Sequence, residues 1–381
     1  MSIRRARRIL FFLNSGVHGG VEEVVLSLLK GLPRDRFEPY LAAPPSLLEA
    51  FAKPLEPLNV TTLPIELRSW RQWREIRMLF AYLRRHRIEI VNSHLFYATC
   101  FAAPIARLAG VPCVVETTHG PELWRSSWWK KGCFVDRCVE LFVSLNIAVS
   151  EANRKYLERT KRYPVRKLRV VPNGRDLSQY TEAPEEHVRQ LRRHLGLEAN
   201  NKVAVVIGRL EEQKGHRYLI DALPDVTAER PDFRVVFVGE GSLRRKLQDR
   251  VTALGLECNV IFAGHRADVA LFYALADFAI LPSLYEGMPL VAIEAAAAGR
   301  ALIATAADGT TEVVVPGVTG VLVPKQSAEA LTEAIHDLLD NPLKAQALGR
   351  AARRRAETLF SVERQVEETG RLFEECATAG G

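Results

Sequence analysis

Two glutamates, Glu286 and Glu294, enclose the stretch E-G-M-P-L-V-A-I-E. Pro289 lies where a loop is expected to become a helix, and the free N–H groups of a first helical turn favour an anion in front of them. Glu294 follows Pro289 by five residues, about 7.5 Å along a helix. The two carboxylates can therefore reach different parts of one extended ligand. This spacing predicts a nucleotide-sugar site, in which one carboxylate holds a sugar and the other a ribose.

Two cationic residues, Arg209 and Lys214, follow the apolar run 203–207, which has the composition of a buried strand. We expect both to hold a diphosphate, because a nucleoside diphosphate leaving group gains negative charge as the glycosidic bond breaks. The sequence has no Asp-x-Asp pair that could hold a metal. The prediction is therefore that side chains and helix N-termini balance this charge, with no metal and no cofactor. Taken alone, the two cations could equally be solvated loop charges.

The segments around these residues resemble those of retaining glycosyltransferases with the GT-B fold, in the large family called family 4. Residues 208–215 resemble the family signature G-R-L-x-x-x-K-G, and residues 286–294 resemble its E-x7-E element. V-V-P-N-G at 170–174, G-G-V-E at 19–22, A-V-S at 148–150 and V-F-V-G-E-G at 236–241 resemble further family segments, in family order. The resemblance implies an α/β protein of two Rossmann-like, doubly wound parallel-sheet domains facing a central cleft. It also implies transfer of a sugar, with retention, from a nucleotide diphosphate sugar to a hydroxyl acceptor.

The same resemblance implies roles for individual residues. Glu286 would hold hydroxyl groups of the donor sugar, and Glu294 would accept hydrogen bonds from the ribose. Gly287, Met288 and Leu290 would offer backbone N–H groups to the distal phosphate. Gly19 and Gly20 would let the backbone approach the phosphate or the acceptor closely.

His119, in the segment T-T-H-G, resembles a His-Gly position that the family places beside the donor sugar. A lone histidine at a strand end is more often structural, so its assignment to the catalytic set with Glu286, Arg209 and Lys214 depends on the resemblance. The role of His94 is left open. Arg175 stands where the family usually has an aliphatic residue, which leaves its local contact undecided.

The elements that must position these residues alternate between strand and helix, as parallel sheets require. We expect strands at 8–13, 88–92, 113–117, 146–149 and 168–171, then at 203–207, 234–238, 260–263, 278–281 and 301–305. An amphipathic helix is predicted over 70–86, with Trp73 on its apolar face, and another over 356–378. Ser150 should cap a helix, and Asn173-Gly174 should form a turn. The predicted domains are 1–180 and 181–360, with a helix at about 361–381 packing back onto the first, as the resemblance implies.

The first half of the chain is basic. Residues 1–180 carry 29 Lys and Arg against 16 Asp and Glu, a net charge of +13, whereas residues 181–381 have a net charge of −6. No nucleic-acid-binding motif accompanies this charge. We therefore expect no nucleic acid but a sugar acceptor or a phosphorylated or lipid-linked one, and attachment to an anionic membrane surface. The tryptophans and lysines of 124–131 would fit either core packing or an interfacial anchor.

The remaining features concern compartment and specificity. Six cysteines lack C-x-x-C pairs and nearby histidines, so we expect reduced thiols in a cytoplasmic protein, peripheral on the inner face of the cell membrane. A UDP-sugar is the favoured donor and a GDP-sugar the second choice, in polysaccharide or glycolipid synthesis; the oligomeric state is left open. Two alternatives are a nucleotide-sugar 2-epimerase and a non-catalytic sugar-nucleotide-binding protein. The motifs at Arg209, Lys214, Glu286 and His119 argue against both.

Overall fold

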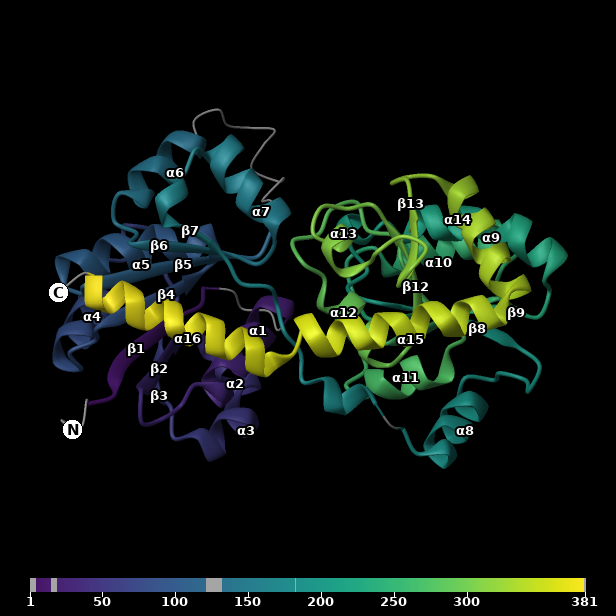
Figure 1. The fold of residues 1–381 in the computed structure, drawn as a ribbon, viewed down its shortest axis with the longest axis horizontal. Helices are drawn as coiled ribbons and strands as arrows, with labels where there is room; N and C mark the ends of the chain where they lie inside the picture. Colours follow the sequence, from purple (N-terminus) through teal and green to yellow (C-terminus); the bar gives the residue numbers. More distant parts are fainter. Residues whose placement is uncertain (1–4, 15–18, 121–131, 182, 380–381) are drawn as a thin grey trace. The chain divides into compact units, whose positions relative to one another are not determined.

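The computed structural model of the 381-residue chain describes residues 5–14, 19–120, 132–181 and 183–379 (Figure 1). The chain forms two compact units. Unit 1 contains Met1–Gly174 and Val362–Gly381, and unit 2 contains Arg175–Ser361.

Unit 1 contains, within the described residues, one sheet of seven parallel strands in the order β3-β2-β1-β4-β5-β6-β7. Successive strands pair in parallel because the helices between them cross over the sheet. The strands are β1 (Arg7–Phe12), β2 (Phe37–Ala43), β3 (Thr61–Pro64), β4 (Ile90–His94), β5 (Cys113–Thr118), β6 (Leu145–Ala148) and β7 (Leu168–Val170).

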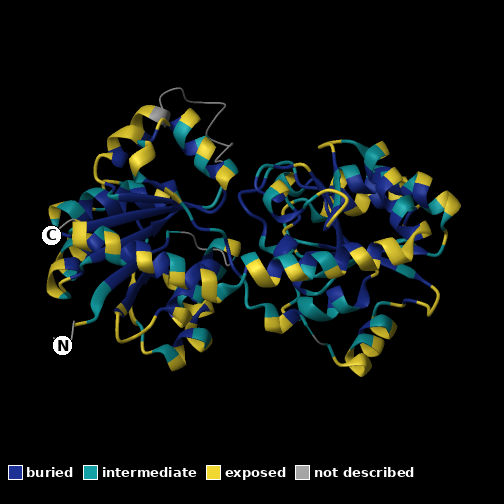
Figure 2. Ribbon diagram, in the orientation of Figure 1, coloured by how far each residue is buried: buried dark blue, intermediate teal, exposed yellow. Residues whose placement is uncertain are grey.

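The helices of unit 1 bury apolar side chains against this sheet, whose strands are dark blue in Figure 2. They are α1 (Gly20–Gly31), α2 (Pro45–Ala50), α3 (Ala52–Leu55), α4 (Trp73–Arg85), α5 (Phe96–Leu108), α6 (Gly132–Glu140), α7 (Glu151–Tyr156) and α16 (Val362–Ala379). The last helix belongs to unit 1 because Phe373, which is fully buried, packs edge-on against Phe11 and Phe37 with ring centroids 6.2 and 6.3 Å away. Ser150 caps α7 by accepting a hydrogen bond from Asn153 N (3.1 Å), as predicted.

Unit 2 contains a described sheet of six parallel strands in the order β10-β9-β8-β11-β12-β13, the order of a dinucleotide-binding sheet. Its strands are β8 (Lys202–Ile207), β9 (Phe233–Val238), β10 (Val260–Gly264), β11 (Phe278–Leu281), β12 (Ala301–Thr305) and β13 (Gly320–Val323). Its helices are α8 (Glu185–His194), α9 (His216–Glu229), α10 (Arg244–Ala253), α11 (Val269–Leu275), α12 (Leu290–Ala297), α13 (Thr310–Val313), α14 (Ala328–Asp340) and α15 (Pro342–Leu359). The predicted class, two parallel-sheet α/β domains, is confirmed.

The two units divide at Gly174 and Ser361, whereas the sequence placed the first boundary at 180. The backbone of Arg175 already belongs to unit 2, since its N–H donates to Phe360 O (2.9 Å) and it bridges Ser361. The polar, charge-dense stretch 181–202, which suggested a boundary near 180, contains the exposed helix α8. Its composition reflects contact with solvent, not a linker.

Three expectations from the sequence, two about helices and one about cysteines, were wrong. Trp73 begins α4 but is 56% exposed, so it does not lie on the buried face with Leu79 and Leu83. The helix predicted over 356–378 is interrupted, because α15 ends at Leu359 and α16 begins at Val362. The six cysteines are not all reduced: Cys113 of β5 and Cys376 of α16 form a disulfide with Cα atoms 5.8 Å apart, across a separation of 263 residues. Spacing alone cannot reveal such a pairing.

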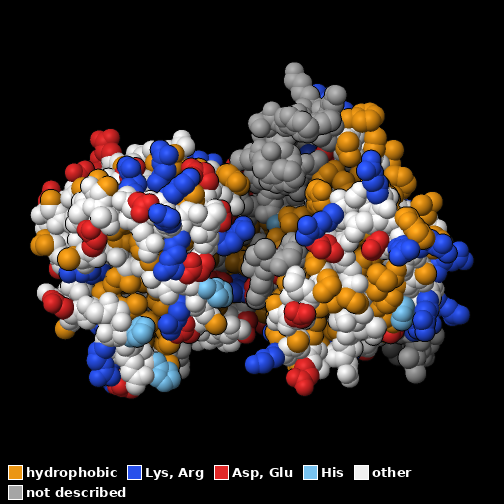
Figure 3. All heavy atoms as spheres, turned by 180° about the vertical axis from the view of Figure 1, so that it is seen from behind, with side chains coloured by type: hydrophobic (Ala, Val, Ile, Leu, Met, Phe, Trp, Pro, Cys, Tyr) orange, Lys and Arg blue, Asp and Glu red, His pale blue; other side chains and the backbone are white. Residues whose placement is uncertain are grey.

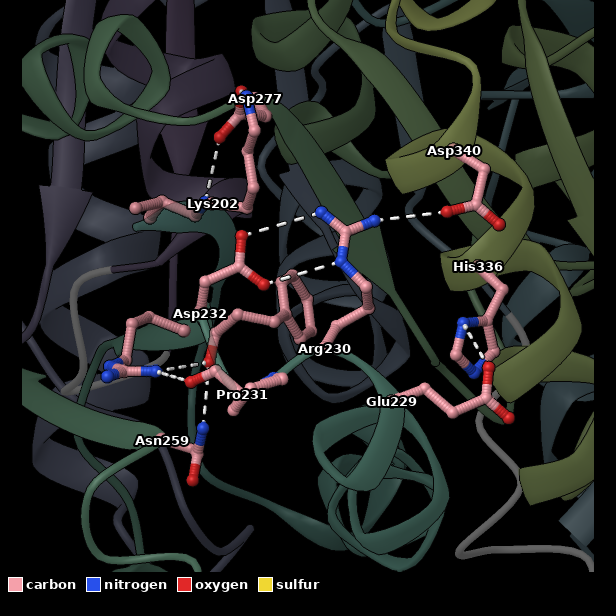
Figure 4. Close-up of polar contacts among 12 residues, drawn as sticks. Lys202, Glu229, Arg230, Pro231, Asp232, Asn259, Asp277, His336 and Asp340 are labelled. Carbon is pink, nitrogen blue, oxygen red and sulfur yellow. Dashed lines mark hydrogen bonds and ion pairs between the residues drawn. The ribbon is translucent and has the colours of Figure 1, made fainter. Parts of the chain in front are cut away.

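Ion pairs and polar contacts hold the edge of unit 2 at which its strands begin (Figure 4). Arg230, beyond the end of α9, contacts Asp232 before β9 (3.3 Å) and Asp340 at the end of α14 (3.1 Å). Lys202, at the start of β8, lies 3.6 Å from Asp277 before β11. At this edge these cations therefore face carboxylates.

Among the described residues, none of the helices combines the length and apolar character needed to span a bilayer.

Candidate active site

The loop after β8 carries the two predicted phosphate ligands. Gly215, which ends this loop, has φ +63°, and a Cβ there would collide with Pro282 O in the loop after β11. Only glycine fits this close approach. The contact joins the loops at the point where the strand order of unit 2 reverses, between β8 and β11. Ligands bind at this switch point in doubly wound sheets.

Lys214 and Glu286 meet across this junction. Lys214 Nζ lies 2.6 Å from Glu286 Oε1, which also accepts a hydrogen bond from Ser283 Oγ (2.7 Å). Glu286 is 6% exposed, so its charge is compensated by a cation and by a hydroxyl group. The sequence predicted both residues in one site, and the structure places them in direct contact.

Arg209, the second predicted cation, is exposed and makes no ion pair with a carboxylate in the described part of the chain. It stands next to Gly208, whose φ of +151° allows the backbone to turn away from β8. Its guanidinium is thus available to an anion from solvent.

Glu294, on α12, is 4% exposed and is held by a cation that the sequence left undecided. Arg175 Nε and Nη2 lie 2.8 and 2.7 Å from Glu294 Oε1. Tyr273 OH is 3.5 Å from Oε2, and Tyr180 OH is 3.2 Å from Arg175 Nη2. Burial and the charge of Glu294 raise the pKa of both tyrosines, so both hydroxyl groups stay protonated. Arg175, which replaces the family's usual aliphatic residue, is therefore the ion-pair partner of Glu294, the predicted ribose ligand.

Gly287, Met288 and Leu290 surround the start of α12. Pro289 precedes the first helical residue instead of occupying it, with φ −73° and ψ 117°. Met288 is buried and Leu290 is the first residue of the helix. These positions lie in the segment that connects Glu286 to the helix carrying Glu294.

In unit 1, His119 follows β5 and His94 ends β4, so the sheet brings them side by side. His94 Nδ1 lies 2.9 Å from His119 Nε2, and His94 Nε2 lies 2.8 Å from Asn92 Oδ1. Asn92 Nδ2 donates to Thr117 Oγ1 (2.9 Å) and to Val115 O (3.4 Å), and the carbonyl, which can only accept, fixes the orientation of the amide. Asn92 Oδ1 must then accept from His94 Nε2–H, and His94 Nδ1 must accept from His119 Nε2–H. This assignment leaves His119 Nδ1 as an acceptor.

Burial keeps both histidines neutral. Desolvation lowers the pKa of His119 to about 4 and that of His94 well below its usual value, and the neighbouring ring lowers the latter further. The sequence analysis identified His119 by resemblance and left the role of His94 open, but it did not identify Asn92. A polar residue two positions before a strand-end histidine has its side chain on the same face, and this alternation could have indicated it.

Of two other predicted features, the structure describes the glycine pair but not the tryptophan-rich segment. Gly19 is the N-cap of α1, and Gly20 is its first residue, at the carboxyl end of β1. This is the edge of unit 1 at which His94 and His119 lie. The aromatic and basic residues of 124–131, including Trp124, Trp128 and Trp129, lie outside the described residues.

Comparison with known proteins gives matches along most of the chain. Residues 18–179 match the family described as Glycosyltransferase Family 4, and residues 188–355 match Glycosyl transferases group 1. A relative from Escherichia coli, UDP-Gal:alpha-D-GlcNAc-diphosphoundecaprenol alpha-1,3-galactosyltransferase, is 26% identical over 93% of each chain. The GDP-mannose-dependent monoacylated alpha-(1-6)-phosphatidylinositol monomannoside mannosyltransferase of Corynebacterium glutamicum is 31% identical, over 68% of this chain and 70% of its own.

A solved structure of Anabaena HepE in complex with UDP and glucose is similar along nearly the whole chain. It is 25% identical, covers 97% of this chain and 100% of its own, and superposes with a TM-score of 0.86.

Proposed function

This chain is a glycosyltransferase that belongs to the family matched by its Family 4 and group 1 segments, and we propose a specific reaction for it. It transfers a sugar from a nucleoside diphosphate sugar, with UDP favoured over GDP, to a hydroxyl group of a lipid-linked acceptor. The E. coli relative is named for a UDP-sugar and a polyprenyl diphosphate acceptor, and the HepE structure for UDP and glucose; both support this choice.

One observation carries the proposal: the 2.6 Å contact between Lys214 and Glu286 at the switch point of unit 2. In that position, Lys214 and the exposed Arg209 stabilise the diphosphate, and Glu286 holds sugar hydroxyls. Backbone groups at Gly287, Met288 and Leu290 contact the distal phosphate. Glu294, fixed by Arg175, accepts from the ribose through carboxylate lone pairs that Arg175 and Tyr273 leave unused.

The reaction proceeds with retention in this proposal. The transition state resembles an oxocarbenium ion, and the departing diphosphate, held by Arg209 and Lys214, stabilises it. The leaving phosphate also accepts the proton of the attacking hydroxyl. Two side-chain cations balance the two charges that a metal would otherwise balance, so the proposal assigns no metal to the reaction.

The histidine pair of unit 1 has a separate role. His119 presents the acceptor atom Nδ1 to a sugar hydroxyl, and the hydrogen bonds from Asn92 through His94 keep it in that tautomer. The backbone at Gly19 and Gly20 approaches the phosphate or the acceptor at the same edge of unit 1.

The surface of unit 1 supports a lipid-linked acceptor. Most of the large hydrophobic side chains that are exposed among the described residues belong to this unit, and several lie on α4, α5 and α6: Trp73, Met78, Tyr97, Leu108, Phe134 and Val135. Figure 3 shows hydrophobic areas on unit 1 with Lys and Arg side chains between them. A surface of this composition suits the headgroup region of an anionic membrane.

A donor screen tests the proposal. Hydrolysis and transfer are measured with UDP-, GDP- and ADP-sugars, in wild type and in Lys214→Ala. We expect turnover of one donor class, UDP-sugars first, and its loss in the variant. Failure of every nucleoside diphosphate sugar to react or to bind would overturn the proposal.

A further inference from the structure

A cavity of about 410 Å³ opens on unit 1 at the edge where β5, β6 and β7 begin. Its wall includes Arg107, Arg166 and Arg169 from the first part of the chain and Glu375 and Cys376 from α16. His94 and His119 lie at the carboxyl ends of their strands, so this cavity is at the opposite edge of the sheet. It is separate from every residue assigned above to the reaction.

The three arginines lack the carboxylate partners that some other arginines of unit 1 have. Arg36 contacts Glu374 and Arg154 contacts Glu151 and Glu158, whereas no described carboxylate forms an ion pair with Arg107, Arg166 or Arg169. The single carboxylate in the wall, Glu375, is exposed and lies 3.8 Å from Arg371. The cavity therefore collects three positive charges against one negative charge.

Neutral oxygens hold two of the guanidinium groups in place. Arg107 donates to Phe142 O (2.9 Å), Val111 O (3.2 Å), Pro112 O (2.8 Å) and Ser144 Oγ (2.6 Å). These bonds use four of its five N–H groups. Burial lowers the pKa of Arg107, which remains a cation. Arg169 Nη1 donates to Arg166 O (3.0 Å) and Leu168 O (2.8 Å), leaving its Nε and Nη2 groups for a ligand.

The opposite wall is fixed as well. The disulfide between Cys113 and Cys376 ties α16 covalently to the first residue of β5. Three guanidinium groups against one carboxylate have the chemistry of a phosphate site, because arginine matches phosphate oxygens with two parallel N–H donors.

We propose that this cavity binds a phosphate group, at a second anion site distinct from the donor site. Arg166 and Arg169 contact the phosphate oxygens, Arg107 supplies a fixed charge behind them, and Glu375 weakens binding by repulsion. The phosphate belongs to a small soluble metabolite or to a lipid headgroup, and the two sources share this chemistry.

The test uses the full chain with Arg209→Ala and Lys214→Ala in the background, so that phosphate cannot bind at the donor site. Inorganic phosphate is titrated by calorimetry into this protein and into the same protein carrying Arg166→Ala and Arg169→Ala. The added pair should weaken binding about tenfold or more, on the scale of a lost charge-assisted hydrogen bond. Glu375→Gln should tighten binding several-fold, an effect that a purely structural role would not produce. Arg71→Ala with Arg74→Ala, two exposed arginines of the same unit, is the matched control and should change nothing.

Chemical labelling locates the ligand. Phosphate should protect Arg166 and Arg169 from phenylglyoxal, mapped by mass spectrometry, and leave Arg71 unprotected. Vesicles of phosphatidylcholine with and without phosphatidic acid separate the two sources. Loss of vesicle binding in Arg166→Ala/Arg169→Ala identifies a headgroup site, and unchanged vesicle binding with weakened phosphate binding identifies a soluble ligand. Equal phosphate affinity in the parent and in Arg166→Ala/Arg169→Ala, or no affinity in either, would overturn the proposal.

Discussion

The contact between Lys214 and the buried carboxylate of Glu286 at the switch point has two possible explanations. A purely structural ion pair would matter for folding alone, whereas a donor ligand must also stabilise charge in the transition state. Lys214 has access to solvent on one side, and Arg209 near it makes no ion pair within the described residues. This excess of positive charge favours the second explanation.

Replacement of Lys214 or Arg209 by alanine should therefore lower kcat/KM about a hundredfold, because each variant loses one charge that stabilises the transition state. Lys202→Ala is the matched control, since Lys202 is paired with Asp277 at the other edge of the same sheet (Figure 4). Steady-state kinetics with circular dichroism as a check on folding decides the matter. Wild-type turnover in both variants would remove the diphosphate role.

Arg175 should act on donor affinity through Glu294. Arg175→Met leaves a buried carboxylate without its cation, which costs about 3 kcal/mol when a buried pair is broken. We expect a lower free energy of unfolding and a higher KM for the donor. The double variant Arg175→Met/Glu294→Gln should recover much of the stability, because the uncompensated charge is gone, but not the donor KM. Recovery of both would show that Glu294 does not contact the ribose.

The neutral histidines predict a loss of stability in acid. An unfolded chain protonates histidine near pH 6.5, whereas the pKa of His119 is lowered to about 4 in the folded protein. The stabilisation is complete above about pH 6.5 and is lost as the pH falls toward 4, by up to about 1.4 kcal/mol per pH unit for each such group. The free energy of unfolding, measured with denaturant between pH 7.5 and 5, should fall less steeply with decreasing pH in His119→Asn than in wild type. The exposed His187→Asn should keep the wild-type dependence on pH. Identical slopes in all three proteins would contradict the assignment.

At this scale, the sequence could predict the residues but only part of their pairing. Glu286 and Lys214 were expected in one site because each belongs to a motif with fixed spacing. The bond from Arg175 to Glu294 joins positions 119 residues apart, and no local pattern encodes it. The same holds for the contact between His94 and His119, which forms only when β4 and β5 pair.

Among the elements, the strands of unit 2 that were predicted were the easiest to place, because each is a short apolar run. Ala301–Thr305 and Phe278–Leu281 match the structure at both ends. β2 and β3 were not predicted, because neither is a continuous apolar run. β2 contains Pro39 and a charged residue, and only one of the four residues of β3 is buried. The break between α15 and α16 was also missed, since apolar residues continue through Leu359 and Val362 with helical spacing.

The disulfide gives α16 a testable role as a structural element. Cys376→Ser should lower the free energy of unfolding of unit 1 by roughly 2–4 kcal/mol, as for a disulfide that closes a long loop. Reductant should destabilise wild type and leave Cys376→Ser unaffected. Cys258→Ser, at an exposed free thiol of unit 2, serves as the control. If reductant has the same effect on wild type and on Cys376→Ser, the bond does not hold α16 in place.

For the whole molecule, charge is distributed unevenly between the units. Unit 1 carries 30 basic and 20 acidic residues, a net charge of +10, and unit 2 carries 22 and 25, a net charge of −3. The first half of the sequence alone has +13, and the acidic α16 lowers this value when it joins unit 1. A basic unit with Trp73 exposed at the start of α4 and Trp70 exposed just before it is the part of the protein expected to meet a membrane.

Co-sedimentation with vesicles tests this expectation. The protein should pellet with vesicles that contain phosphatidylglycerol and stay in solution with phosphatidylcholine alone. Salt should release it, because attraction is screened within about 8 Å at physiological ionic strength. Each basic residue near the surface contributes about 1 kcal/mol, so Arg74→Ala/Arg77→Ala on α4 should weaken binding about tenfold or more. Arg245→Ala/Lys246→Ala on α10 removes the same charge from unit 2 and should have little effect. Equal weakening by both pairs would mean that net charge, not the α4 surface, governs attachment, and equal pelleting with neutral and anionic vesicles would favour a soluble acceptor.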